Sequence, residues 1–357
     1  MTSKCKGGVT GRQFARLSAI AGTLCVTVYI FSRSAALSEW YMCTVYPGVA
    51  AILSFVSGLC PFSLYDVFLI VAALLLIALT VFAAVRKIAF SRFLFLLIRF
   101  VTVVAAWFYF SWGIAYFRKD FYARSGAEEV TFDREIFKDF AIRFIDRANR
   151  CYVDCPETDR VDVQREVESS YRALCKPLHI PYPNGRRRVK PMMFEAAYSK
   201  MGVSGYFGPL FSEIHVNGYG LSFSQPFTLA HEMAHQFGIA TESEANLYAF
   251  AVCSGSSSGS VRYSAYASTL RYVLNDIRRF LPEEYASIVS RVRPEIMADL
   301  QRNREHWLAA RNETLSDVQD RVYDAYLKTN GVTSGRASYS EVVSLLVSYG
   351  IEVDNEK

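Results

Sequence analysis

Three long runs without a charged side chain, residues 17–32, 67–85 and 100–117, most constrain what this chain can fold into. A helix needs about 20 apolar residues to cross the hydrocarbon core of a membrane, so the second and third runs predict membrane-spanning helices. The first run is shorter and fits either an uncleaved membrane helix or a signal peptide, because small residues follow it. We favour the uncleaved helix because residues 43–61 continue largely apolar. Residues 1–117 are therefore predicted to form a three-helix transmembrane region.

The distribution of charge predicts how this region lies in the membrane. Residues 1–117 hold nine Lys and Arg against two acids, whereas residues 118–357 hold 30 basic and 32 acidic residues. The basic side chains gather in the amino-terminal tail and in residues 86–99, while residues 33–66 contain a single Arg. Because basic loops stay in the cytoplasm, three crossings place residues 118–357 on the extracytoplasmic side of the plasma (inner) membrane. The Arg118–Lys119 pair is a weaker signal in the opposite sense.

The same distribution predicts which partners the chain has. The basic surplus belongs to the membrane part and not to the globular part. We therefore expect the lipid bilayer as a partner and no nucleic acid, since nucleic acid binding needs a basic face on a folded domain.

Residues 118–357 have the composition of a globular domain, and their apolar periodicity predicts a mostly α fold with a small sheet. Residues 212–217 alternate apolar and polar side chains and predict a short strand. The Ser/Gly tract at 254–260 predicts a flexible connector, and the basic run at 186–188 predicts a solvated surface loop. The predicted helices cover residues 131–150, 157–175, 227–237, 242–253, 262–279, 282–292, 295–328 and 339–348.

Four cysteines lie in this globular part: Cys151, Cys155, Cys175 and Cys253. On the extracytoplasmic side, a disulfide between Cys175 and either Cys151 or Cys155 would join the first two helices. Free buried thiols are the favoured expectation. A zinc knuckle is disfavoured because no second pair of ligands follows at the required spacing.

The segment FTLAHEMAHQFG at residues 227–238 carries the densest group of chemically active side chains. His231 and His235 are four residues apart, so on a helix they project from one face, one turn apart. Two imidazoles in that arrangement can bind one Zn²⁺, and Glu232 beside them can exchange a proton with a water on the metal. Gly238 can take the left-handed conformation that ends a helix and turns the chain back.

A third metal ligand is expected from the acids just after this turn, Glu242 and Glu244. Glu242 shares a helix face of small residues with Asn246, which could orient a ligand through a hydrogen bond. Glu244 lies three residues after Thr241, in the T-x-x-E pattern of a helix capping box. We favour Glu242 as the ligand, and Glu244 stays the alternative because the connecting loop is short.

Three further side chains are candidates for contacts with a substrate or with the oxyanion of a tetrahedral intermediate. His215 lies on the predicted strand just upstream, and is expected either to line a substrate cleft or to pack in the core. Tyr263 and Tyr266 follow the Ser/Gly tract, and a phenolic hydroxyl can donate to a developing oxyanion. Aromatic core packing is the favoured role of both tyrosines.

These segments together resemble a bacterial family of multi-pass membrane proteins that carry a zincin-type domain and have no assigned function. The resemblance rests on HEMAH followed by ESEAN, on Pro61–Ser63, and on residues 215–238, 263–275 and 339–349. It implies an α+β zincin-like metallopeptidase domain in residues 118–357, and it brings no established substrate.

Two zincin classes resemble different parts of the site. In gluzincins the ligand Glu precedes an Asp or Asn by four residues, which matches Glu242 and Asn246. The gap between the second His and this Glu is much shorter here than in gluzincins. The glycine of the metzincin pattern HExxHxxGxxH matches Gly238, but its last His is Thr241 in this chain.

We therefore expect a membrane-anchored, zinc-dependent metallopeptidase with one zinc ion per chain and a peptide or protein substrate. The two histidines and one of the two acids would hold the zinc, and Glu232 would act as general base and then as general acid. The predicted strand at 212–217 would bind the substrate backbone as an edge strand. The alternatives are a non-catalytic sensor or scaffold stabilised by zinc, and a transporter or assembly factor whose working part is the membrane bundle. The sequence sets no oligomeric state.

Overall fold

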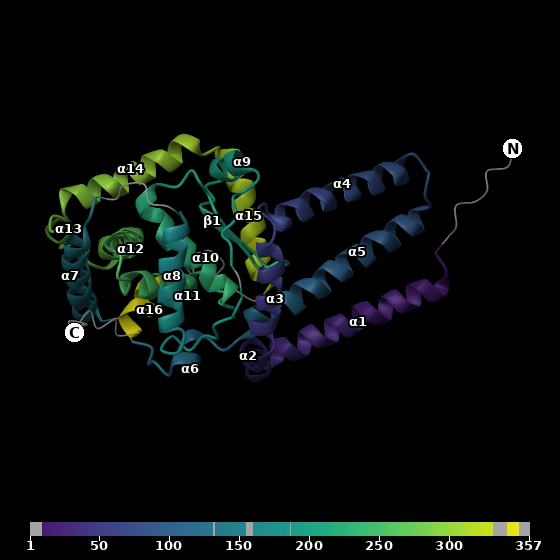
Figure 1. Ribbon diagram of the computed structural model, residues 1–357, viewed down its shortest axis with the longest axis horizontal. Coiled ribbons are helices and arrows are strands. Elements are labelled where there is room, and N and C mark those ends of the chain that lie inside the picture. The colour runs from purple at the N-terminus through teal and green to yellow at the C-terminus, as the bar shows by residue number, and fades with distance from the viewer. Residues whose placement is uncertain (1–8, 131–132, 155–159, 186, 331–340, 350–357) are drawn as a thin grey trace.

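Three long helices extend from one side of a larger helical body in the computed structural model (Figure 1). The structure describes residues 9–130, 133–154, 160–185, 187–330 and 341–349.

The extended helices are α1 (Gly11–Arg33), α4 (Leu64–Ala84) and α5 (Phe90–Ser111), which correspond to the three predicted spans. Each is long and apolar enough to cross a membrane, and very little of its apolar surface is buried within the chain. α5 contacts both α1 and α4. Apolar surface this extensive fits a lipid environment, since soluble proteins rarely leave such patches in water.

The third span begins and ends earlier than the predicted 100–117. Arg92 and Arg99, expected in a loop, belong to α5 and are exposed on it. Arginine does not stop a helix, because it is a good helix former whose long side chain can reach the membrane surface. The helix stops before Trp112, which leaves the helical conformation (φ −166°), and the 3₁₀ turn η1 (Gly113–Phe117) follows.

Two short helices, α2 (Ala35–Thr44) and α3 (Tyr46–Gly58), fill the junction between the spans and the body. Figure 1 shows α3 lying across the body-side ends of the spans. The buried face of these helices packs with η1 into an aromatic-rich cluster that is separate from the main core. Its buried members are Tyr41, Met42, Tyr46, Ala50, Trp112, Ile114, Ala115 and Ala240.

Buried charges of the body hold the ends of α3 and α4. The carboxylate of Glu213 accepts hydrogen bonds from the backbone N–H groups of Leu64 (3.1 Å) and Tyr65 (2.8 Å), which begin α4. Lys190 Nζ donates to the carbonyl of Ser57, near the end of α3, at 2.6 Å. A carboxylate at a helix N-terminus and an ammonium at a C-terminus both complement the helix dipole, so these contacts stabilise the joint.

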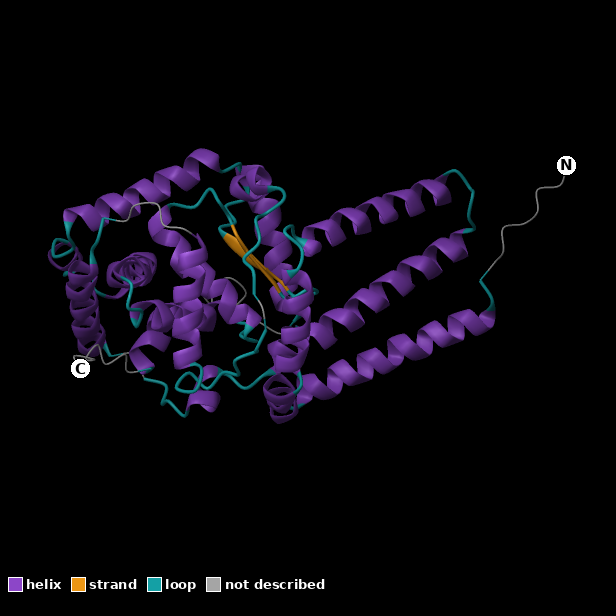
Figure 2. Ribbon diagram, in the orientation of Figure 1, coloured by secondary structure: helices purple, strands orange, loops and turns teal. Residues whose placement is uncertain are grey.

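The body has one hydrophobic core, built around α10 (Gln225–Gln236), α11 (Glu242–Ser254) and α12 (Gly259–Phe280). These helices contact one another, and α7 (Arg134–Cys151) and α8 (Arg160–Leu174) pack on their outside. Figure 2 shows helices throughout and one β hairpin, so the mostly α fold with a small sheet is confirmed. The remaining elements are α6 (Phe121–Ser125), α9 (Glu195–Lys200), η2 (Ser222–Ser224), α13 (Tyr285–Val289), α14 (Pro294–Ala310), α15 (Glu313–Thr329) and α16 (Glu341–Ser348).

The hairpin pairs β1 (Gly205–Gly208) with β2 (Glu213–Val216) in antiparallel orientation. β2 is the strand predicted at 212–217, and its other side forms a parallel bridge between His215 and Lys190. All of its residues are buried and the backbone N–H of Lys190 already donates to the carbonyl of Ile214, so β2 does not offer the free edge that was expected to bind a substrate. β1, which is too short and glycine-bounded to show an alternating pattern, is the edge strand of the described sheet.

Three segments differ from their prediction. Arg187, expected in a solvated loop, is buried because it pairs with Glu168 at 2.5 Å and lies over the ring of Phe237. The predicted helix at 295–328 is two helices, α14 and α15, which break where the backbone N–H of Asn312 donates to the carbonyl of Lys200, the last residue of α9. Of the helix predicted at 282–292, only α13 forms.

The Ser/Gly tract is a short turn between α11 and α12, held in place by one carboxylate. Ser256 and Ser257 donate hydroxyl hydrogen bonds to Oε1 of Glu166 on α8, at 2.5 and 2.8 Å. These bonds fix the turn, which the sequence suggested would be flexible.

The cysteines that the structure describes in the body, Cys151, Cys175 and Cys253, are free thiols, as favoured from the sequence, and form no disulfide with one another. Cys155 lies outside the described residues, so only the Cys151–Cys175 pairing is excluded here.

Candidate metal centre

The histidine pair lies on α10, whose two ends explain its position. Pro226 occupies the first turn, where its missing N–H costs no hydrogen bond. The chain turns back at Gly238, whose φ of +86° is the left-handed conformation predicted for it. A Cβ at this position would lie 2.6 Å from Met42 of the junction, so the close packing also requires glycine.

The turn brings Glu242, the first residue of α11, to the two histidines. Nε2 of His231 lies 3.1 Å from Nε2 of His235 and 3.1 Å from Oε2 of Glu242. Nε2 of His235 lies 3.7 Å from Oε1 of Glu242. Within the described part of the chain, this is the group of His, Cys, Asp and Glu side chains that could hold a metal ion.

The donor set and its spacing fit zinc. Ligand atoms 2.0–2.1 Å from a tetrahedral ion lie about 3.3 Å from one another, close to the separations above. Nδ1 of His231 lies 3.1 Å from Oδ1 of Asn246, and Nδ1 of His235 lies 2.8 Å from the carbonyl oxygen of Ile239. Both acceptors favour a hydrogen on Nδ1, which leaves the lone pairs of Nε2 directed at the cluster. Asn246 thus makes the orienting contact expected of it.

Glu232 lies next to this cluster without belonging to it. It follows His231 on α10, and only 5% of it is exposed. A Cβ on Gly205, the first residue of β1, would lie 2.8 Å from Oε1 of Glu232. Glycine therefore allows the edge strand to approach this carboxylate closely, which places free backbone groups beside it.

Burial and neighbouring charges set the protonation of these groups. Burial lowers the pKa of His235 to about 4 and raises the pKa of Glu232 to about 8. Burial opposes the charge on His231 and on Glu242 as well. Their mutual hydrogen bond and opposite charges nevertheless raise the pKa of His231 and lower that of Glu242. Glu232 can therefore carry a proton near neutral pH while Glu242 stays ionised.

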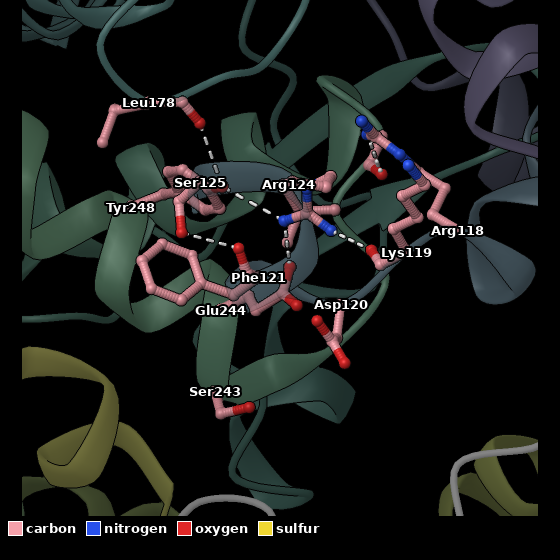
Figure 3. Close-up of polar contacts among 12 residues, drawn as sticks. Arg118, Lys119, Asp120, Phe121, Arg124, Ser125, Leu178, Ser243, Glu244 and Tyr248 are labelled. Atoms are coloured by element: carbon pink, nitrogen blue, oxygen red, sulfur yellow. Dashed lines mark hydrogen bonds and ion pairs between the residues drawn. The ribbon is translucent and has the colours of Figure 1, made fainter. Parts of the chain in front are cut away.

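Glu244, the alternative ligand, points to a different partner. Its Oε2 accepts a hydrogen bond from Nη2 of Arg124 at 2.5 Å, and the same nitrogen donates to the hydroxyl of Tyr248 at 3.1 Å (Figure 3). Arg124 also donates to the carbonyl of Lys119. The capping box expected with Thr241 does not form, because Arg124 holds the carboxylate that would have made it.

The three candidates for substrate or oxyanion contacts lie in the core instead. His215 is fully buried, stacks on an aromatic ring, and its Nε2 lies 2.8 Å from Oγ of Ser63. The buried hydroxyl of Tyr263 donates to Asp299 at 2.5 Å. Tyr266 packs against two phenylalanines. All three side chains are buried and pack in the core, which is the role favoured for them from the sequence.

One neighbour of the cluster was missed from the sequence. The hydroxyl of Tyr323 on α15 donates to Oε1 of Glu242. It is 81 residues away along the chain, so no local spacing links the two. An inward-facing aromatic on an amphipathic helix is the only signal, and ordinary core helices share it.

The carbonyl end of α10 is capped by the membrane junction. Trp112 Nε1 donates to the carbonyl of His235 at 2.7 Å, and the hydroxyl of Tyr46 donates to that of Gln236 at 2.5 Å. Arg118 Nη1 donates to the carbonyl of Gly238 at 2.9 Å. The last carbonyls of a helix have no partner inside it. The carbonyl of His235 also accepts the backbone N–H of Gly238 at 3.0 Å, so Trp112 adds a second donor there, while Tyr46 and Arg118 donate to the carbonyls that follow.

One protein family matches most of the chain. No curated protein and no solved structure matches it. Residues 41–347 match the family described as "Protein of unknown function (DUF3810)", a stretch that includes the junction, α4, α5 and the whole metal cluster. Because this match covers far more than half of the sequence, the chain belongs to the DUF3810 family.

Proposed function

We propose that this protein is a membrane-anchored zinc metallopeptidase that hydrolyses peptide bonds. The observation that carries the proposal is the convergence of His231, His235 and Glu242, with the buried carboxylate of Glu232 beside them and outside the ligand set. Two imidazoles and one carboxylate leave a fourth position on a tetrahedral ion, as catalytic zinc sites do.

The chain's own residues supply the proton transfer and the orientation. A zinc ion held at this centre would polarise a peptide carbonyl and lower the pKa of a water molecule. Glu232 accepts a proton from the attacking water and later donates one to the leaving amine. Its burial beside the cluster supports this role, because burial raises the pKa of this carboxyl in the metal-free protein and so favours its taking up a proton. Asn246 and Tyr323 hold His231 and Glu242 in position.

The edge of β1 is the element suited to bind the substrate backbone. One edge of β1 pairs with β2, and no other strand that the structure describes pairs with its opposite edge. An extended peptide added there would gain main-chain hydrogen bonds and would pass close to Glu232, which contacts the start of β1.

The proposed enzyme has its body on the extracytoplasmic side of the plasma membrane. The far ends of the spans carry the start of α1, with Arg12 and Arg16, and the α4–α5 turn, with Arg86 and Lys87, whereas the body lies at the opposite ends (Figure 1). Basic residues favour the cytoplasmic side, which supports this orientation.

A direct test incubates the full-length protein, in detergent with zinc, with a library of peptides derived from a proteome. We expect the wild type to create new amino termini that mass spectrometry detects, and a chelator to abolish them. Glu232→Gln should keep zinc and lose cleavage, while His179→Gln, a change at an exposed histidine outside the cluster, should keep both. Equal cleavage by wild type and Glu232→Gln would contradict the proposal.

A zinc-stabilised sensor or scaffold is the second candidate. The observation that favours it is the capping of α10 by Tyr46, Trp112 and Arg118, which links the metal helix to the membrane junction. If Glu232→Gln retained every cellular function of the wild type while zinc-free variants lost it, this second function would be supported.

A further inference from the structure

The metal centre lies next to the ends of the membrane spans. α5 ends at Ser111, and the following residue, Trp112, donates directly to the carbonyl of His235. One turn earlier, Trp107 Nε1 donates to the carbonyl of Leu210 in the loop after β1. Since tryptophan concentrates at the membrane–water interface, these residues mark where the spans leave the lipid. One side-chain length therefore separates the end of a span from a metal ligand.

α3 presents an apolar stripe at the same level. Ile52, Phe55, Val56 and Leu59 repeat at helical spacing and are all exposed, Ile52 at 66%. The opposite face is buried, and α3 contacts both α5 and β2. Because α3 lies across the ends of the spans in Figure 1, its orientation suits a helix that rests in the membrane interface.

Two other exposed apolar segments adjoin the span ends. Met193 and Phe194 are about half exposed, and the backbone N–H of Met193 donates to Asp66 in the first turn of α4 at 2.9 Å. A surface pocket places Leu315, the start of a second stripe on α15, beside these two residues.

The carboxyl-terminal end of α15, which carries this second stripe, also contacts a membrane span. Val318 and Val322 continue it and are exposed. Asn330, just past the end of α15, accepts a hydrogen bond from Tyr109 in the last turn of α5 at 3.3 Å. We define the apolar collar as Ile52, Phe55, Val56, Leu59, Met193, Phe194, Leu315, Val318 and Val322.

We propose that the collar rests in the lipid surface around the spans, so that the metal centre acts on polypeptide segments close to the bilayer. The substrates are then membrane proteins or anchored proteins, cut in the stretch that adjoins their own membrane segment. Lipid is the occupant of the collar because each part of it is joined, by chain continuity or by a hydrogen bond, to the end of a membrane span. The substrate class rests on the peptidase function proposed above.

The position of the collar can be measured in the full-length protein without any substrate. Phe55→Trp adds a fluorophore to the collar, and Ile136→Trp adds one at an exposed apolar site on α7, at the end of the body far from the spans. Both variants are reconstituted into liposomes whose lipids carry bromine at a shallow or at a deep acyl position. We expect shallow bromine to remove most of the fluorescence added at 55 and none of that added at 136. Equal quenching at the two sites, or stronger quenching at residue 55 by deep bromine, would contradict the proposal that the collar rests in the lipid surface.

The substrate class is tested in cells that produce wild type or Glu232→Gln, by sequencing protein amino termini. Termini specific to the wild type should lie within about ten residues of a membrane segment, which is at most roughly 33 Å of extended chain. Termini spread through soluble domains would overturn this inference and leave the peptidase proposal standing. An absence of wild-type-specific termini would overturn the peptidase proposal, and this inference with it.

Discussion

Zinc should stabilise the protein through Glu242 and not through Glu244, although the two acids are only two residues apart. Glu242 lies 3.1 Å from His231 in the metal cluster, whereas Glu244 pairs with Arg124 at 2.5 Å. Replacing either acid by Gln keeps its size and removes its charge. The two variants therefore form a matched pair that separates a metal ligand from a structural ion pair.

The expected effects follow from mass action and from the burial of each pair. At free zinc 1,000-fold above its dissociation constant, binding adds about 4 kcal/mol to the stability of the wild type. For a protein larger than about 150 residues, this raises Tm by about 10 °C. Glu242→Gln should lose most of this rise. Glu244→Gln should keep it, while its metal-free Tm falls by about 10 °C, because an unpaired buried Arg124 costs about 3–5 kcal/mol.

The assay follows unfolding of the full-length protein in detergent by tryptophan fluorescence, before and after zinc is added to chelator-treated samples. Bound zinc per chain is measured in parallel. If zinc raised the Tm of Glu242→Gln as much as that of the wild type, the assignment of Glu242 as a metal ligand would be refuted. If Glu244→Gln instead abolished the zinc-dependent increase in Tm and left the metal-free Tm unchanged, Glu244 would be the true ligand.

Three other predictions follow from single contacts. Trp112→Phe removes one of the two donors to the carbonyl of the second cluster histidine, so we expect a loss of about 0.5–1.5 kcal/mol in denaturant unfolding and weaker zinc binding. Trp107→Phe, which loses a bond to a loop carbonyl, should leave zinc affinity unchanged. Gly205→Ala places a Cβ 2.8 Å from Oε1 of Glu232, so peptide cleavage should fall while bound zinc per chain stays at the wild-type value. Burial lowers the pKa of His215 to about 4. Metal-free protein should therefore lose up to about 3 kcal/mol of stability as the pH falls from 6.5 to 4, because the unfolded chain takes up the proton first, and His215→Gln should flatten that slope.

Local spacing was enough to predict the histidine pair and the turn, but not the choice between the acids. The i, i+4 spacing of His231 and His235 and the glycine at 238 act within one helix and its end, where backbone geometry decides the outcome. The direction of Glu244 depends on Arg124, which is 120 residues earlier in the chain. No pattern within a helix contains that information.

The same limit explains why the sequence left the roles of the strand and of the aromatic residues open. The alternation at 212–217 correctly predicts extended backbone, yet an edge strand and a central strand differ only in their neighbours. Lys190 supplies the neighbour that buries β2, and it also reaches the end of α3. Tyr263 and Tyr266 have the chemistry of oxyanion donors, but their helix turns them toward the core.

The membrane junction is the part of the fold with the most consequence for the site. Tyr46 and Trp112 belong to the region that the sequence marks as transmembrane, yet they donate to the carbonyls at the end of the metal helix. Losing either of these hydrogen bonds would cost about 0.5–1.5 kcal/mol. A body without its membrane region would therefore lack groups that hold His235 in place. Zinc affinity and membrane insertion should consequently depend on each other, because both stabilise the same end of α10.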